Sequence, residues 1–197
     1  CMGIGTWQSP YDVAKNAVLS ALSCGYRLID TAAAYGNEKG VGAGIAASGL
    51  DRSEIFVTSK LRNADHGYKA TLDAFELTME KLGLEYLDLY LIHWPNPVQF
   101  RTHWEESTAQ TWRAFEKLYK EGRIKAIGVS NFMPHHIETL LKTAEIKPMV
   151  NQLKLCPGIT QPEIVDYCKK NDIVTEAYSP FGTGLILSVD EMKKLAE

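Results

Sequence analysis

Short apolar runs alternate along the chain with longer segments whose apolar residues recur at helical spacing. The runs are nearly continuous in hydrophobic residues, as is typical of strands buried on both faces of a parallel sheet. Strands are expected at residues 2–7, 26–30, 54–60, 86–94, 124–131, 148–155 and 173–181. Helices are expected at residues 10–25, 37–50, 67–85, 107–123, 133–145, 161–172 and 188–197. Strands that alternate with helices predict βαβ units, a parallel sheet and a single domain.

Two expected helices indicate which of their faces enters the core. The first carries its apolar spacing on Val13, Ala17, Leu19 and Ala21. The third carries it on Leu72, Phe75, Leu77, Met79 and Leu82. The second is loosened by the glycines of "VGAGIAASG". Because these glycines do not form a strand-to-helix turn, we interpret them as sites of close packing and not as a dinucleotide fingerprint.

Polar residues end the apolar runs repeatedly. They are Asp30, Lys60, His93, Ser130, Asn131, Asn151, Gln152, Tyr178 and Ser179. These ends recur about every 30 residues, and the units of a (β/α)8 barrel are about 31 residues long. Such a barrel builds its active site at the C-terminal ends of its strands, whereas an open doubly wound sheet binds ligands mainly at one switch point. Since nearly every strand has a polar end, the pattern favours a closed ring around one pocket.

Four of the polar residues form a chemical group if they meet at neighbouring strand ends. They are Asp30, Tyr35, Lys60 and His93. Taken singly, each is more typical of a turn, a cap or a solvated position. Together, the Lys60 ammonium is expected to lower the pKa of Tyr35, and Asp30 to hold Lys60 charged. His93 is expected either to share a proton or to position a substrate oxygen. A tuned acid of this kind suits carbonyl reduction with a hydride donor.

Further residues near the same ends are candidates for binding. Trp7 and Trp94 either pack on the barrel end or form an apolar pocket for a carbonyl substrate. Tyr178 is expected to stack on a flat heterocycle, and the amides of Asn151 and Gln152 to hydrogen-bond a carboxamide. The sequence contains no nucleophile elbow and no P-loop, so those two chemistries are not indicated.

Composition narrows the class of protein. The 197 residues are 45% hydrophobic and 23% charged, and the formal net charge is −3. This balance gives no reason to expect nucleic acid or an anionic membrane as a partner. No apolar stretch approaches a membrane span and no secretory leader is evident, so a cytoplasmic protein is expected. Its four cysteines, Cys1, Cys24, Cys156 and Cys168, are expected to be reduced, and no metal site is expected.

Several motifs together resemble the aldo-keto reductase family, specifically the bacterial group related to diketogluconate and glyoxal reductases. "GYRLIDTAAAYGNEKGVG" and "AFEKLYKEGRIKAIGVSNF" resemble its two signatures, and "SKL", "LDLYLIHWP", "VNQ" and "AYSP" follow in order. The resemblance implies a (β/α)8 TIM-type barrel and reduction of aldehydes and ketones with NADPH, NADH being possible. It places the catalytic roles on Tyr35, Asp30, Lys60 and His93, the cofactor contacts on Ser130, Asn131, Gln152, Tyr178 and Ser179, and the substrate contacts on Trp7 and Trp94.

The chain also departs from the family pattern. Arg62 stands where the family often has Trp, and it either favours an acidic substrate or points outward. Lys154 and Cys156 replace the usual Glu and His, which is expected to alter local packing only. The eighth βα unit and the N-terminal hairpin are expected to be missing, and with them the segment that holds the adenosine 2′-phosphate. Residues 1–197 are therefore expected to form a single, incomplete barrel domain.

Three functions remain open from the sequence. The first is an NADP(H)-dependent reductase of a small aldehyde, ketone or dicarbonyl, working as a monomer or weak homodimer. The second is a non-catalytic nucleotide-binding or regulatory relative. The third is another barrel enzyme, such as an isomerase or aldolase, that uses Lys60 as a Schiff-base amine. Asp30 disfavours the third, because it would keep Lys60 protonated.

Overall fold

Seven parallel strands form one sheet in the computed structural model, which describes residues 2–196. The strands are β1 (Gly3–Gly5), β2 (Leu28–Asp30), β3 (Phe56–Leu61), β4 (Leu89–Ile92), β5 (Ile127–Ser130), β6 (Val150–Lys154) and β7 (Val174–Tyr178). Each strand pairs in parallel with the next strand along the chain. The predicted βαβ organisation is confirmed. Six strands lie inside their expected segments, and β3 extends one residue beyond its expected end, to Leu61.

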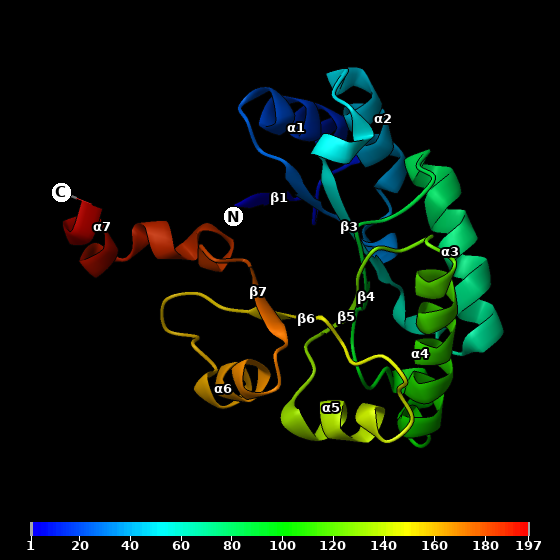
Figure 1. Ribbon diagram of the computed structural model, residues 1–197. Coiled ribbons are helices and arrows are strands. Elements are labelled where there is room, and N and C mark those ends of the chain that lie inside the picture. Colours follow the sequence, from blue (N-terminus) through cyan, green and yellow to red (C-terminus); the bar gives the residue numbers. More distant parts are fainter. Residues whose placement is uncertain (1, 197) are drawn as a thin grey trace.

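Helices connect the strands and cover the outside of the sheet (Figure 1). They are α1 (Tyr11–Ser23), α2 (Glu38–Ser48), α3 (Tyr68–Leu82), α4 (Trp104–Lys120), α5 (Pro134–Leu141), α6 (Pro162–Lys170) and α7 (Asp190–Ala196). Short 3-10 turns are η1 (Ala33–Tyr35), η2 (Arg52–Glu54), η3 (Asn63–Asp65), η4 (Val98–Phe100) and η5 (Gly182–Ser188). Helix α4 begins three residues earlier than expected, because Glu105 and Glu106 suit the positive end of a helix dipole although they break the apolar period.

The sheet is strongly curved. Gln152 on β6 donates a hydrogen bond of 2.7 Å to Asp30 on β2. These strands are four positions apart in the sheet, which in a flat sheet would separate them by about 19 Å. The sheet therefore curls into a nearly closed barrel, which confirms the expected (β/α)8-type fold with seven of its strands. Strands β1 and β7 are its two edges.

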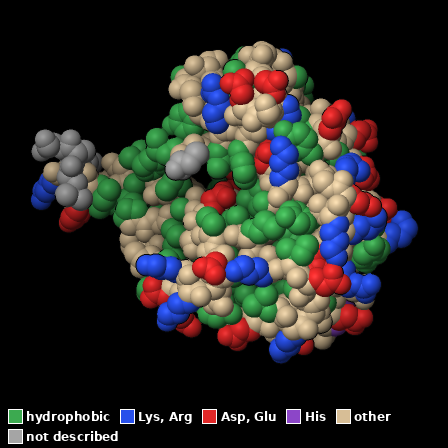
Figure 2. All heavy atoms as spheres, viewed as in Figure 1, with side chains coloured by type: hydrophobic (Ala, Val, Ile, Leu, Met, Phe, Trp, Pro, Cys, Tyr) green, Lys and Arg blue, Asp and Glu red, His purple; other side chains and the backbone are tan. Residues whose placement is uncertain are grey.

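Apolar side chains are exposed near these edges. Val174 on β7 is 64% exposed, and Phe181, Leu185 and Leu187 of the following segment are 61%, 74% and 67% exposed. Figure 1 shows η5 and α7 projecting beyond the ring of helices. Figure 2 shows hydrophobic side chains gathered between the two ends of the chain. The segment that follows β7 thus exposes apolar side chains beside the open side of the barrel.

The predicted core faces of two helices need correction. Helix α1 buries Ala14, Val18 and Leu22, while Val13 is 53% exposed, so its buried stripe lies one residue later than expected. Both stripes have the same helical spacing, and only the packing against the barrel distinguishes them. In α3, Leu77 is exposed and Thr78 is buried. The Thr78 hydroxyl can enter the core because it donates to the buried Glu38 carboxylate.

The glycines of α2 lie at close backbone contacts, which confirms their interpretation as packing sites. A Cβ at Gly42 would lie 2.1 Å from the Leu82 carbonyl oxygen, and one at Gly40 would lie 2.4 Å from the Tyr11 carbonyl oxygen. Helix α2 can therefore lie directly against the backbone on both sides.

The described part of the chain contains free thiols. The three described cysteines, Cys24, Cys156 and Cys168, are free thiols, and Cys1 lies outside the described residues. Among residues 2–196, no helix has the length and apolarity to cross a membrane. No cluster of His, Cys, Asp or Glu suited to a metal ion occurs in the same range.

Replacing Gly42 with Ala is expected to destabilise the fold. In an open helix this change would stabilise by about 1 kcal/mol, but here the methyl group meets the Leu82 carbonyl oxygen. We expect a net loss of about 1–3 kcal/mol in the free energy of unfolding, measured by urea titration. Lys39→Ala, on an exposed position of the same helix, is the control and should stay within about 0.5 kcal/mol of the wild type. A Gly42→Ala protein as stable as the wild type would contradict the close contact.

His66 is expected to make the fold sensitive to acid. It is 4% exposed and stacks on Phe100 with ring centroids 5.7 Å apart. Burial lowers the pKa of His66 from 6.5 to about 4. The unfolded chain therefore binds this proton first as the pH falls, and stability declines between about pH 6.5 and pH 4. Full stability from this group is present at neutral pH.

The comparison that isolates this effect is between wild type and His66→Leu. From pH 7 to pH 5 the wild type should lose about 2 kcal/mol more unfolding free energy than the variant. Urea titrations at both pH values measure the difference. His135→Gln, at an exposed histidine, is the control and should keep the wild-type slope. Equal slopes for wild type and His66→Leu would show that His66 does not contribute.

Candidate active site

Most of the predicted site residues meet at one end of the barrel. Asp30 ends β2, Lys60 lies near the end of β3 and His93 directly follows β4. Ser130 ends β5 and Tyr178 ends β7. Because all strands are parallel, their carboxyl ends share one end of the barrel, and the side chains that follow them converge there.

Lys60 is the centre of the predicted catalytic group. It is 1% exposed. Its Nζ donates to Asp30 Oδ1 at 2.6 Å, to the Thr31 carbonyl oxygen at 3.0 Å and to the Tyr35 hydroxyl at 3.4 Å. An ammonium group has three hydrogens, so the buried charge has three acceptors. The structure therefore brings Asp30, Tyr35 and Lys60 together as predicted.

The loop that carries Tyr35 is held by backbone geometry and by Asn37. Tyr35 ends the short turn η1, and Gly36 follows in the left-handed region with φ of 70°, which costs little for glycine. The Asn37 side chain is 2% exposed and donates to the Thr6 and Ser9 carbonyl oxygens at 2.7 and 2.8 Å. These bonds tie the loop after β2 to the loop after β1, and they fix the position of the phenol.

The electrostatics correct one expectation from the sequence. Burial raises the pKa of Tyr35 above 10, although the Lys60 charge opposes that shift. The phenol is therefore protonated at neutral pH and carries a proton that it can donate. For Lys60, burial lowers the pKa, but attraction to Asp30 and Tyr35 outweighs burial and leaves it raised. The amine is thus charged, which disfavours its use as a Schiff-base nucleophile.

His93 lies beside the phenol. The rings of Tyr35 and His93 meet edge to face with centroids 5.9 Å apart. Burial and the nearby Lys60 charge lower the pKa of His93 to about 4. The imidazole is therefore neutral at physiological pH and presents one N–H donor. Of the two roles considered from the sequence, this favours positioning a substrate oxygen over sharing a proton.

The predicted cofactor contacts form a second network on β5, β6 and β7. The Tyr178 hydroxyl donates to Asn131 Oδ1 at 3.0 Å, and Asn131 Nδ2 donates to the His93 carbonyl oxygen at 3.1 Å. Ser130 Oγ donates to the Gln152 carbonyl oxygen at 2.9 Å. Asn131 has φ of 62°, a left-handed conformation that Asn tolerates better than most residues. This network directly adjoins the catalytic group through His93.

The remaining predicted residues are placed less centrally. Asn151 is buried on the other face of β6, where its Nδ2 donates to the Phe132 carbonyl oxygen at 2.9 Å, so the expectation that it faces a carboxamide is wrong. Its neighbour Gln152 faces the barrel interior, as alternation along a strand requires. Ser179 follows β7 with φ of 49°. Trp7 and Trp94 are 53% and 45% exposed, at a rim and not in the core.

Arg62, a departure noted in the sequence, is paired with Asp65. Its Nε and Nη2 donate to the two Asp65 carboxylate oxygens, both at 3.0 Å. The Arg62 side chain is 55% exposed. The guanidinium keeps its charge, but the adjacent Asp65 carboxylate and the solvent reduce its attraction for an acidic substrate. The geometry favours the outward alternative.

Glu176 is a site residue that the sequence analysis did not identify. It lies on β7, two residues before Tyr178, so the period of two along a strand places both side chains on the same face. Its Oε1 accepts a hydrogen bond of 2.8 Å from Gln152 Nε2. Burial raises the pKa of Glu176, and the Asp30 charge adds to the shift. In "VTEAY", Glu176 stands two positions before Tyr178, and this spacing predicts that both side chains face the site.

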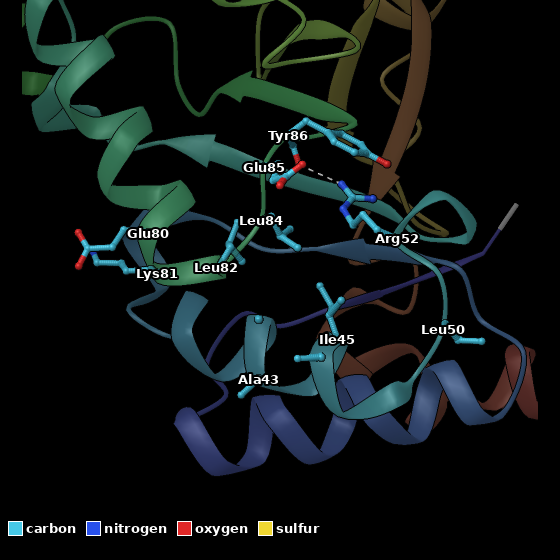
Figure 3. Close-up of a pocket in the computed structure, with 13 residues that line it drawn as sticks. Ala43, Ile45, Leu50, Arg52, Glu80, Lys81, Leu82, Leu84, Glu85 and Tyr86 are labelled. Atoms are coloured by element: carbon cyan, nitrogen blue, oxygen red, sulfur yellow. Dashed lines mark hydrogen bonds between the residues drawn. The ribbon is translucent and has the colours of Figure 1, made fainter.

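A groove of about 580 Å³ lies elsewhere on the molecule. Figure 3 shows its lining residues, which come from α2, η2, the end of α3 and the loop between α3 and β4. Arg52 in this groove donates to the Tyr86 carbonyl oxygen at 3.0 Å. Arg52 and Tyr86 precede β3 and β4, so the groove belongs to the end of the barrel opposite the catalytic group. That end of such barrels serves stability and not chemistry.

Comparisons with known proteins identify the family of the chain. Glyoxal reductase of Bacillus subtilis (strain 168) is 54% identical over 184 residues, which are 93% of this chain and 64% of that protein. The 9,11-endoperoxide prostaglandin H2 reductase of Trypanosoma cruzi (strain CL Brener) is 50% identical over 185 residues, 93% of this chain and 62% of that protein. The chain thus spans less than two thirds of the length of both relatives.

Solved structures give the same result. A crystal structure of an aldo/keto reductase from Brucella melitensis matches with a TM-score of 0.90 and 48% identity, over 98% of this chain and 72% of that one. A variant of the protein Gox0644 in complex with NADPH matches with a TM-score of 0.88 and 41% identity, over 98% and 68% of the two chains. The model of the Aldo/keto reductase family matches residues 1–194. The chain therefore belongs to the aldo/keto reductase family.

Proposed function

We propose that this chain carries the catalytic group of an NADPH-dependent reductase that converts aldehyde and ketone carbonyls to alcohols. The observation that carries the proposal is the buried Lys60 ammonium, which hydrogen-bonds both Asp30 and the Tyr35 hydroxyl. This arrangement tunes a phenol as a proton donor. Membership of a family whose relatives are named as reductases and dehydrogenases supports the same reaction type.

The donors and acceptors beyond His93 fit a reduced nicotinamide. Ser130, Asn131 and Gln152 offer polar groups for its carboxamide, Tyr178 offers an aromatic face for its ring, and Ser179 follows Tyr178 at the same strand end. When bound, this cofactor supplies a hydride to the carbonyl carbon. Structures of relatives with NADPH or NADP support the choice of cofactor.

Tyr35 is proposed as the general acid. Its raised pKa keeps the phenol protonated until negative charge develops on the carbonyl oxygen, which then takes the proton. The Lys60 ammonium, held by Asp30, stabilises the phenolate that remains. His93 is neutral and can donate a hydrogen bond to the same oxygen, which orients the carbonyl and polarises it.

The substrate is proposed to be a small aldehyde, ketone or dicarbonyl. Trp7 and Trp94 are half-exposed at the rim, where an apolar substrate group could lie against them. The relative from Bacillus subtilis named glyoxal reductase supports a small dicarbonyl as the first compound to test. The net charge of −3 gives no support for a nucleic-acid partner.

NADPH oxidation with glyoxal, small aldehydes and keto sugars tests the proposal directly. We expect turnover by the wild type and a loss of at least about 100-fold in kcat for Tyr35→Phe, because phenylalanine has no proton to donate. Tyr11→Phe is the matched control at a tyrosine that is 49% exposed on α1, and it should keep full activity.

Two other results would oppose the proposal. Equal turnover by wild type and Tyr35→Phe would assign the proton to another group. A folded wild type that binds NADPH but shows no turnover with any carbonyl would instead support the non-catalytic nucleotide-binding alternative. Titration of NADPH against the protein's tryptophan fluorescence separates that result from simple failure to bind.

A further inference from the structure

We propose that Glu176 is a positioning residue that fixes the rotation of the Gln152 amide, so that Gln152 Oε1 faces the amino group of the nicotinamide carboxamide. The proposal deepens the function proposed above and rests on it. Glu176 itself does not touch the cofactor. It acts through Gln152.

The first step is the pairing of the two side chains. Gln152 and Glu176 are directly registered on the neighbouring parallel strands β6 and β7. Registered residues of paired strands point to the same face of the sheet, and here that face is the barrel interior. Gln152 is 2% exposed, so its amide needs partners within the protein.

The second step is the assignment of the amide hydrogens. Gln152 Nε2 donates to Asp30 Oδ2 at 2.7 Å and to Glu176 Oε1 at 2.8 Å. If the Gln152 amide were turned by about 180°, its Oε1 would face these two carboxyl oxygens. An ionised carboxylate would repel that oxygen. Both hydrogens of the amide are therefore committed, and Oε1 is the polar atom of Gln152 that remains for a ligand.

The third step shows why Glu176 is needed in addition to Asp30. The terminal torsion of glutamine is broad and has no sharp minimum. One hydrogen bond to Asp30 would leave the amide free to turn about that bond. A second bond to Glu176, from the other side, fixes the plane of the amide. A carboxyl group offers an acceptor oxygen whether it is ionised or protonated, so this effect does not require a charge on Glu176.

The fourth step concerns what the fixed oxygen can recognise. A carboxamide presents one acceptor and one amino group with two donors. The Ser130 hydroxyl and the Asn131 amino group, next to Gln152, donate to oxygens of the protein itself, so the amino end of the carboxamide is the end that the free Gln152 oxygen can recognise. An amide oxygen held in place by two carboxyl groups suits the amino group. Glu176 thus contributes to the discrimination of a carboxamide from a ketone of the same shape.

Calorimetric titration with NADP⁺ and with its 3-acetylpyridine analogue tests this role without any turnover. The analogue has a methyl group where the carboxamide has its amino group. We expect the wild type to bind NADP⁺ about five- to tenfold more tightly than the analogue. Glu176→Leu removes the acceptor, so this variant should bind NADP⁺ and the analogue with about equal affinity. In Glu176→Gln, whose side-chain oxygen can still accept from Gln152, it should be retained.

The controls separate this role from a structural one. Glu163→Leu, at an exposed glutamate on α6, should keep the wild-type preference. A general disturbance of the barrel would weaken NADP⁺ and the analogue by the same factor and leave their ratio unchanged. Circular dichroism confirms that each variant is folded, and Glu176→Ala replaces Glu176→Leu if the larger side chain prevents folding.

Three results would overturn the inference. If Glu176→Leu still prefers NADP⁺ over the analogue as the wild type does, Glu176 does not position Gln152, and the reductase proposal is unaffected. A Glu176→Gln variant that loses the preference would show that charge acts here and not the hydrogen bond. A wild type that binds neither nucleotide would remove the reductase proposal, and with it the role inferred for Glu176.

Discussion

The burial of one ammonium group is the constraint on which the site depends. The Lys60 side chain is 2% exposed, and its charge is compensated by Asp30 at 2.6 Å. Breaking such a pair by removing one partner costs about 3–5 kcal/mol in proteins, because the other charge is left in a medium of low polarity. The ends of β2 and β3 must therefore stay together. The Thr31 carbonyl oxygen and the Tyr35 hydroxyl complete the shell of Lys60, so the same requirement also fixes the position of the phenol.

Asp30 extends this constraint across the barrel. One carboxylate oxygen accepts from Lys60 and the other accepts from Gln152 on β6. A single carboxylate thus joins the group that is proposed to donate a proton to the group that is proposed to hold a cofactor. The link crosses the interior and not the sheet, so it depends on the curvature of the whole barrel. Outside the sheet, the close contact between Gly42 of α2 and the Leu82 carbonyl oxygen at the end of α3 packs two of the surrounding helices together.

Much of this arrangement could be predicted from the sequence, because strand and helix segments alternate along the chain and polar residues recur at the strand ends. Alternating strand and helix patterns predict the parallel sheet, and polar residues at the strand ends predict where the chemistry lies. The failures have physical causes. Asn151 and Gln152 are adjacent in the sequence, but neighbouring strand residues face opposite sides, so only Gln152 faces the interior. Val13 and Leu77 were expected in the core because hydropathy alone does not choose between adjacent helical stripes.

Other features depend on burial, which no local pattern reports. The sequence predicts the sign of the effect that Lys60 has on the Tyr35 pKa, but not that burial outweighs it. Glu176 sits in a short strand run that otherwise reads as apolar, and its partner Gln152 is 24 residues away in the chain. Both errors concern how deeply a polar group lies and what surrounds it. Such information arises only when distant strands are brought into one interior.

The interior also holds an imbalance of charge that bears on the proposed chemistry. One ammonium, Lys60, lies near two carboxyl groups, Asp30 and Glu176. Burial raises the pKa of Glu176, and the neighbouring Asp30 charge raises it further, so Glu176 is the carboxyl that accepts a proton more readily than usual. A proton on Glu176 removes the excess negative charge and leaves the Asp30–Lys60 pair intact. The positive charge of Lys60 then remains available to the Tyr35 oxygen, where negative charge would develop in the proposed proton transfer.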